Sequence, residues 1–187
     1  MIAHRVVLVR HGTPEVEEGV LAAEWQLSAC GRIAAISLAR SFRDCAFDRI
    51  ASSPEPKATG TAEAIASQLG LAIEIDQGFS EHSRRSVGFL TQEELESAIA
   101  RLFDHSDSLV FGEETASQAY ARFCVAIDRQ SARSTHDLLI VTHGTIMAIY
   151  LSRVLDIAPL PLWRSLKMPM AVILDDGKMR LVEPTLN

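Results

Sequence analysis

Hydrophobic and polar residues along this chain form blocks that are typical of strands and helices following one another. Two runs, residues 6–9 and 138–141, are apolar without interruption. Such runs are typical of strands buried on both faces, as at the centre of a parallel sheet. Shorter strands are predicted around residues 48–52 and 71–75.

Between these runs, apolar residues recur at the three- and four-residue spacing of a helix. Capping residues and breakers give the expected ends. The predicted helices start at Ser28, run from Ser53–Pro54 to Gly70, start at Thr91, and cover residues 116–127 and 146–155.

The remaining segments are predicted as connections or as a hairpin. Residues 76–90 are interpreted as an ordered loop that buries Phe79, Val87 and Phe89, and the stretch with Pro159, Pro161 and Trp163 as a connection. Residues 171–174 and 179–182, joined by Asp175-Asp176-Gly177-Lys178, predict a terminal hairpin.

Alternating strands and helices predict a single domain over residues 1–187 of the α/β class. We expect three layers: a doubly wound, mainly parallel sheet flanked by helices, with a C-terminal hairpin. The length of 187 residues suits one domain with a full core.

Composition favours a soluble protein, with 48% hydrophobic and 22% charged residues. No apolar run approaches the roughly 20 residues of a membrane span, and the first strand begins too early to leave room for a signal peptide. Cys30, Cys45 and Cys124 have no metal-binding spacing, so we expect reduced thiols in a cytoplasmic protein.

The net charge of −6 and the isoelectric point near 5.5 provide no basic field for nucleic acid or a membrane surface, so neither is an expected partner. An anion-binding site would have to be a local group of cations. The sequence carries no signature of oligomeric state, and a homodimer is left open.

Candidate chemistry gathers at the ends of the two buried strands, which continue as Arg10-His11-Gly12 and Thr142-His143-Gly144. The carboxyl ends of parallel strands share one edge of a sheet, where ligands bind in open α/β folds. The strand at 48–52 brings Lys57 to the same edge, at a helix N-terminus that favours anions. This pattern predicts a phosphate-sized anion site.

Further short stretches follow in a fixed order between residue 5 and about residue 150. They are Arg10-His11-Gly12, Leu27-Ser28-Ala29-Cys30-Gly31-Arg32, Ser52-Ser53-Pro54 with Thr61-Ala62, Glu81, Gly112-Glu113 and Thr142-His143-Gly144. In this order they resemble the motifs of the histidine phosphatase superfamily, whose members are similar to phosphoglycerate mutase.

The resemblance implies a metal-independent phosphomonoesterase, with no cofactor, acting on a small phosphorylated metabolite. His11 would become a transient phosphohistidine, Arg10 would clamp phosphoryl oxygens, and a protonated His143 would neutralise charge in the transition state. Glu81 would protonate the leaving alkoxide and then deprotonate water, which requires a raised pKa; a bound phosphate would raise it.

Two positions depart from the family pattern. Lys57 stands where the family normally has a second arginine, so it would hold phosphate as a point charge, without the planar fork. Thr13 follows the glycine directly instead of lying two residues after it, which puts its phosphate contact in question. Thr13, Arg84, Arg85 and Glu113 are the candidate substrate contacts, and either arginine could compensate for Lys57.

Three other functions remain open at this point. A mutase-like phosphoryl transfer would need a longer enclosing lid than the irregular segments 13–24 and 76–90 offer. A metallohydrolase could use His11 and His143 with carboxylates, although the usual ligand spacing is missing. A non-catalytic phosphate or phosphopeptide binder is consistent with Lys57.

Overall fold

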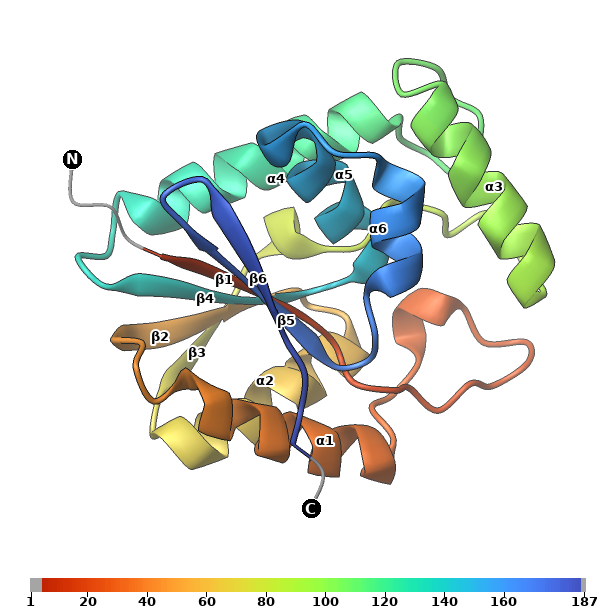
Figure 1. Ribbon diagram of the computed structural model, residues 1–187. Helices are drawn as coiled ribbons and strands as arrows, with labels where there is room; N and C mark the ends of the chain where they lie inside the picture. The colour runs from red at the N-terminus through yellow and green to blue at the C-terminus, as the bar shows by residue number, and fades with distance from the viewer. Residues whose placement is uncertain (1–4, 186–187) are drawn as a thin grey trace.

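The computed structural model describes residues 5–185, in which six strands form one sheet with helices on both faces (Figure 1). The first four strands are parallel, and the last two add to one edge in antiparallel pairings, in the order β3-β2-β4-β1-β5-β6. The strands are β1 (Val6–Arg10), β2 (Phe47–Ser52), β3 (Ala72–Ile75), β4 (Asp137–Thr142), β5 (Met170–Asp175) and β6 (Lys178–Val182). This confirms the predicted α/β class with a mainly parallel sheet and a C-terminal hairpin.

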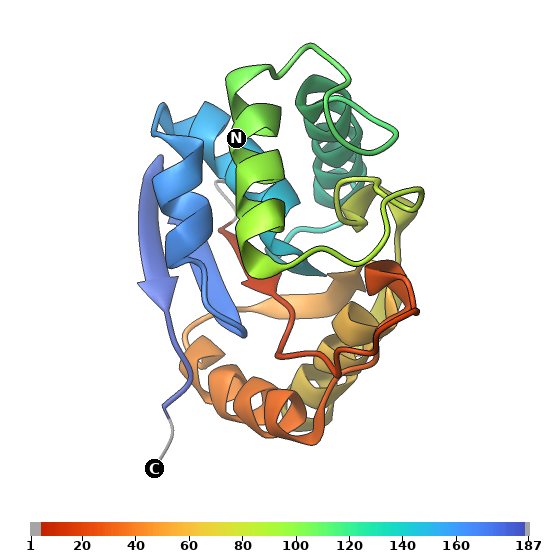
Figure 2. The same ribbon diagram turned by 90° about the vertical axis from the view of Figure 1, so that its right-hand side faces the viewer.

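The helices form two outer layers. One face of the sheet is covered by α1 and α2, and the other by α4, α5 and α6, with α3 packed against α6 (Figures 1 and 2). The helices are α1 (Ala29–Ala39), α2 (Pro56–Leu69), α3 (Gln92–Asp104), α4 (Ala116–Ser131), α5 (Gly144–Leu155) and α6 (Pro159–Ser165). None of the helices in residues 5–185 has the length and apolarity needed to cross a membrane.

The central strand β1 shows why its sequence is apolar without interruption. Val7 and Val9 pack with α1 and α2, while Leu8 packs on the opposite face with α4 and α5, and all three are fully buried. A strand buried on both faces has no solvent side to make polar.

Helix starts follow the predicted caps, with one shift. Ser28 accepts a hydrogen bond from the Gly31 amide, and Thr91 forms a capping box with Glu94. However, α2 begins at Pro56 rather than at Pro54. The chain is still extended at Ser53, whose amide donates to the Val141 carbonyl at 2.9 Å and so continues the sheet.

In three further segments the hydrophobic pattern predicted the structure only in part. The predicted connection at residues 159–163 is helix α6; Pro159 sits in its first turn, where proline is tolerated, and Trp163 is buried. Phe79 is buried as expected, whereas Phe89 is 53% exposed and the expectation for it was wrong. The hairpin turn at Asp176–Gly177 is confirmed.

Candidate active site

The residues that follow the parallel strands extend the sheet by one step and form a common edge. The amide of His11 donates to the Thr142 carbonyl at 3.0 Å, and the amide of Asp76 donates to the Ser52 carbonyl at 2.9 Å. His11 and His143 therefore come together, with their ring centroids 5.1 Å apart. Figure 2 views the molecule from the side on which this edge, the loop after β1 and α3 lie.

The ring of His11 is held in one tautomer. Its Nδ1 lies 2.8 Å from the carbonyl oxygen of Gly12, which can only accept, so Nδ1 carries the proton and Nε2 presents a lone pair. Burial lowers the pKa of His11 well below its ordinary value, and electrostatic interactions with His143, Lys57 and Arg10 lower it further. The imidazole is therefore neutral at neutral pH, as a nucleophile must be.

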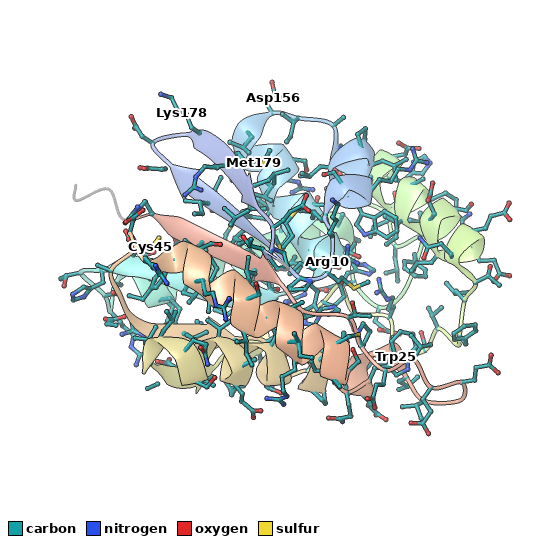
Figure 3. The ribbon with its side chains drawn as sticks, turned by 60° about the horizontal axis from the view of Figure 1, so that its bottom comes forward. Arg10, Trp25, Cys45, Asp156, Lys178 and Met179 are labelled. Atoms are coloured by element: carbon teal, nitrogen blue, oxygen red, sulfur yellow. The ribbon has the colours of Figure 1, made fainter. Side chains whose placement is uncertain are left out.

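Arg10 reaches the same place from the last position of β1 (Figure 3). Its guanidinium donates to the Leu166 carbonyl and packs on Gly144, where a Cβ atom would lie 2.9 Å from the guanidinium carbon. Only glycine at position 144 leaves room for this approach.

Two buried nitrogens at this edge have no protein partner. Of the side-chain nitrogen and oxygen atoms buried within residues 5–185, only three lack a hydrogen bond, and two of them are Arg10 Nε and His143 Nδ1. An unpaired buried polar atom is costly, so such atoms call for a ligand or water. Arg10 Nε can donate to a bound anion, and His143 Nδ1 can do so when it carries a proton.

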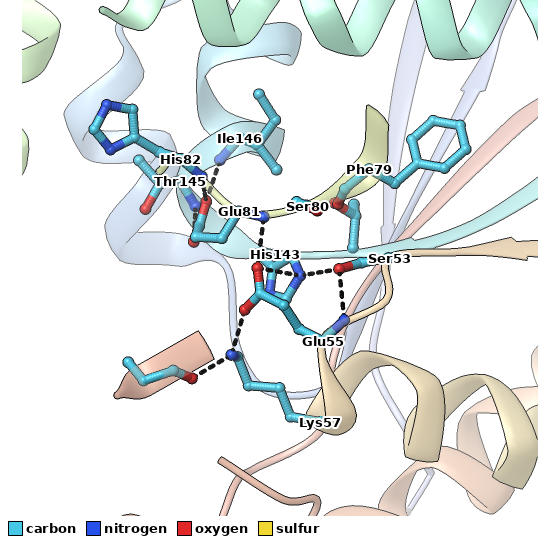
Figure 4. Close-up of polar contacts among 12 residues, drawn as sticks. Ser53, Glu55, Lys57, Phe79, Ser80, Glu81, His82, His143, Thr145 and Ile146 are labelled. Atoms are coloured by element: carbon cyan, nitrogen blue, oxygen red, sulfur yellow. Dashed lines mark hydrogen bonds and ion pairs between the residues drawn. The ribbon is translucent and has the colours of Figure 1, made fainter. Parts of the chain in front are cut away.

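His143 is fully buried between a hydroxyl and a carboxylate. Its Nε2 lies 2.7 Å from Ser53 Oγ and 3.5 Å from Glu55 Oε1 (Figure 4). Burial lowers the pKa of His143 well below its ordinary value; Lys57 lowers it further, and Glu81 opposes this. Without a bound anion, His143 is neutral rather than protonated.

Lys57 is already paired before any phosphate arrives. Its ammonium donates to Glu55 Oε2 and to the Ala22 carbonyl, each at 2.6 Å, and both side chains of the pair are buried (Figure 4). The other carboxylate oxygen of Glu55 accepts the amide of Glu81 at 2.9 Å. Glu55 thus links three predicted site residues, Lys57, Glu81 and His143.

Sequence reasoning assigned no role to Glu55. A signal for Glu55 was present in Pro54-Glu55-Pro56-Lys57, at the start of a helix. There a carboxylate stands two residues before Lys57, the position that differs from the family pattern. Residues two apart do not face each other within a helix. The pair forms because Glu55 is still extended when Lys57 has entered the first turn.

Glu81 caps the N-terminus of α5. Its carboxylate accepts the amides of Thr145 at 3.1 Å and Ile146 at 2.9 Å, and lies 3.8 Å from Arg84. Burial raises the pKa of Glu81, but the charge of Arg84, the electrostatic interaction with His143 and the bonded amides outweigh burial and hold the pKa well below its usual range. Glu81 is therefore ionised in this structure, so an acid role requires it to gain a proton when substrate binds.

The segment that carries Glu81 is fixed by an arginine of α4. Arg122 donates to the carbonyls of Gly78, Ser80 and Glu81 at 2.9–3.2 Å, and pairs with Glu114 at 2.7 Å. Arg122 was not singled out from sequence, because nothing in a helical pattern tells which loop an arginine will reach.

Glu113 fixes the next part of the same loop. Its carboxylate accepts the Ser83 hydroxyl at 2.7 Å and the Arg85 amide at 2.9 Å, and also bonds Ser86. The preceding Gly112 has φ +73°, and a Cβ there would lie 2.0 Å from the Ser83 carbonyl oxygen. The Gly112-Glu113 element therefore holds the 83–86 loop in place.

A cavity of about 1180 Å³ opens over these residues. It is lined by most of the predicted site: Arg10, His11, Thr13, Lys57, Glu81, Arg84, Arg85 and Glu113. The Thr13 hydroxyl donates to the Met168 carbonyl at 3.4 Å, and Arg85 is exposed at the surface. No group of three or more His, Cys, Asp or Glu side chains in residues 5–185 is placed to hold a metal ion.

A mainly parallel α/β sheet whose edge carries an Arg-His pair beside a second histidine is the arrangement of a histidine phosphatase. The family model for the histidine phosphatase superfamily (branch 1) matches residues 6–174, and the chain belongs to this superfamily. Comparison with curated proteins gave no match.

Solved structures show the same fold at low sequence identity. The mycobacterial glucosyl-3-phosphoglycerate phosphatase complexed with VO3 aligns over 98% of this chain and 100% of its own, with 21% identity and a TM-score of 0.74. Bacillus stearothermophilus YhfR aligns over 99% and 98%, with 21% identity and a TM-score of 0.72. The Entamoeba histolytica phosphoserine phosphatase in complex with 3-phosphoglyceric acid aligns over 97% and 98%, with 19% identity and a TM-score of 0.73.

Proposed function

We propose that this protein is a phosphomonoesterase that hydrolyses a small phosphorylated metabolite through a phosphohistidine on His11. The observation that carries the proposal is the free Nε2 lone pair of His11 beside two buried, unpartnered nitrogens, Arg10 Nε and His143 Nδ1. Oxygens of a phosphoryl group would satisfy both nitrogens while Nε2 faces phosphorus. Phosphatases among the fold's solved relatives support the same class of reaction.

In the first step Nε2 of His11 attacks phosphorus, and the bond from phosphorus to the leaving oxygen breaks. Glu81 gives its proton to that oxygen, which departs as an alcohol. The proton on Glu81 is taken up when substrate binds, because a phosphate dianion beside the carboxylate disfavours its ionised form.

In the second step water attacks the phosphohistidine and gives a proton to Glu81. The nitrogen–phosphorus bond breaks, inorganic phosphate leaves, and the lone pair returns to Nε2. Arg10 and a His143 protonated by the arriving anion stabilise charge on the phosphoryl oxygens in both steps. Arg84, which lies 3.8 Å from Glu81, adds a further positive charge to the site.

The direct test is chemical trapping of the intermediate. Wild-type protein, labelled phosphate ester and a chelator are mixed and quenched in alkali, and the labelled residue is identified by peptide mapping. We expect label on His11 and p-nitrophenyl phosphate turnover in the presence of chelator. His11→Ala should lose the label and at least about a thousandfold in kcat/KM, while His105→Ala, an exposed histidine outside the cavity, should match wild type.

Each alternative function has its own signature in this experiment. Equal rates for wild type and His11→Ala refute the nucleophile. Transfer of label to an added alcohol instead of water indicates the mutase-like reaction. Phosphate binding without turnover indicates a binding module, and loss of activity with chelator indicates a metal enzyme.

A further inference from the structure

We call the part of the cavity formed by Arg10, His11, Lys57 and Glu81 its floor. Beyond this floor, the walls of the cavity are largely apolar. They come from the loop after β1, from the segment leading into α3, and from α6 and the loop after it. The apolar lining residues include Val16, Val20, Trp25, Phe89, Trp163 and Met168.

Several of these side chains are exposed to solvent although they are large and hydrophobic. Val16 is 59% exposed, Phe89 53% and Met168 38%, and all three line this one cavity. Single exposed hydrophobic residues are ordinary, but several around one functional cavity mark a surface that a ligand covers. They come from three separate segments of the chain.

The apolar walls are held in place before any ligand binds. The loop after β1 is closed by the amide of Glu15, which donates to the Gln26 carbonyl at 2.9 Å, and by the Trp25 indole, which donates to the Val20 carbonyl at 3.2 Å. Figure 3 shows Trp25 on this loop. On the other side, Glu113 fixes the 83–86 loop that leads to Phe89.

The carboxylates that line the cavity away from the floor are already engaged within the chain. Glu113 binds the 83–86 loop, Glu114 pairs with Arg122, and Glu96 pairs with Arg164. These groups are occupied, so a hydroxyl-rich leaving group would have to displace protein contacts to use them. An apolar group needs no such exchange.

The volume also exceeds what a phosphoryl group needs. Pockets of about 300–1000 Å³ bury most of a drug-sized ligand, and this cavity has about 1180 Å³. The additional space adjoins the apolar walls.

We propose that this apolar half of the cavity is the leaving-group subsite, and that the substrate is a phosphate monoester of an apolar alcohol with an extended alkyl chain or aromatic ring. The inference rests on the proposed phosphomonoesterase function and specifies its substrate class. Apolar contact alone would then discriminate between esters whose reacting atoms are identical.

Linear alkyl monophosphates from ethyl to octyl provide the test, because their leaving alkoxides are almost equally basic and differ only in apolar surface. We expect kcat/KM to rise about two- to fourfold for each methylene until the subsite is filled. A terminal hydroxyl should reverse the gain, so 6-hydroxyhexyl phosphate should fall about tenfold below hexyl phosphate.

Variants locate the effect. Val16→Ser and Phe89→Ser, both at exposed positions, should each flatten the dependence on chain length. Leu109→Ser is the matched control, because Leu109 is 62% exposed but does not line the cavity; its dependence should equal that of wild type.

The outcomes separate this inference from the function on which it rests. If p-nitrophenyl phosphate and every alkyl ester are left intact, the phosphomonoesterase proposal itself fails. If the esters are hydrolysed with no dependence on chain length, or the hydroxylated ester is preferred, the apolar subsite is refuted and the phosphatase stands. A chain-length dependence equally steep in Val16→Ser, Phe89→Ser and Leu109→Ser refutes the proposed location.

Discussion

The floor and the walls of the cavity are built on opposite principles. The floor is formed where parallel strands end, and its groups are buried and bonded to backbone, as His11 is to Gly12 and Glu81 is to the start of α5. The walls come from loops that expose Val16 and Phe89. Chemistry needs fixed positions and fixed protonation states, which a sheet edge provides, whereas apolar contact tolerates loops that differ from one protein to another.

A second contrast lies between two carboxylates near His143, of which Glu55 is buried and Glu81 is partly buried. Glu81 is held by backbone amides of α5 and faces the cavity. Glu55 is held by Lys57 and contacts His143 at 3.5 Å. The nearest cation to Glu81 is Arg84 at 3.8 Å, so an arriving anion can raise the pKa of Glu81, whereas Glu55 is held by a cationic partner at 2.6 Å. We therefore assign proton transfer to Glu81 and charge balance to Glu55.

Of the two carboxylates, Glu81 should show the larger effect when it is replaced by glutamine, and the effect of Glu81→Gln should depend on the leaving group. An alkoxide cannot leave without a proton, so kcat/KM for hexyl phosphate should fall about 10²–10⁴-fold. Nitrophenolate leaves unprotonated, so p-nitrophenyl phosphate should lose less than about tenfold.

Steady-state kinetics on the two substrates check this, with Glu55→Gln as the paired variant. Glu55→Gln should change both substrates by the same factor. Equal losses for both substrates in Glu81→Gln would show that Glu81 acts only by positioning α5, and a leaving-group dependence in Glu55→Gln would exchange the two assignments.

The sequence was most informative about the floor because two different patterns converge there. Unbroken apolar runs locate strands buried on both faces, and the residues after Val9 and Val141 then share an edge by geometry alone. The meeting of His11 and His143 followed without knowledge of any side-chain position.

What could not be predicted depends on contacts between elements far apart in the chain. The link from Glu55 to Lys57, Glu81 and His143 requires three side-chain directions that no periodicity encodes. The low pKa of Glu81 arises from Arg84, from His143 and from bonded amides, and the amides of α5 lie more than 60 residues away. Helix α6 was not predicted because prolines usually indicate the end of a helix. They are tolerated in the first turn, but the sequence pattern did not show that a first turn lies at Pro159.

Lys57 and Glu55 should show opposite effects on phosphate affinity. Lys57→Ala removes a cation from the floor and leaves Glu55 unpaired, so the Ki of inorganic phosphate should rise about tenfold or more. Glu55→Gln keeps the geometry but frees the charge of Lys57, so the Ki should fall severalfold.

Product-inhibition measurements on both variants test this, with Glu63→Gln as a control for charge on the outer face of α2, where Glu63 lies 3.6 Å from Arg32. A rise of the Ki in Glu55→Gln would mean that the carboxylate positions the lysine for phosphate. No change in Lys57→Ala would place the lysine outside the phosphate contacts.

The smallest expected effect is a shift of the acid limb in the pH profile of kcat/KM. The proposed mechanism requires neutral His11 in the free protein, and the lowered pKa of His11 keeps it neutral until the pH falls well below 6.5. Lys57 is one cause of that lowering, so Lys57→Ala should raise the pKa and move the limb upward by less than about one unit. Lys57→Arg keeps the charge and should leave the limb in place. Rates of p-nitrophenyl phosphate hydrolysis from pH 4 to 8 measure the limb in both variants. The ionisation of the substrate affects both variants equally, so it does not change the comparison. A downward shift of the limb in Lys57→Ala would contradict the electrostatic coupling between Lys57 and His11.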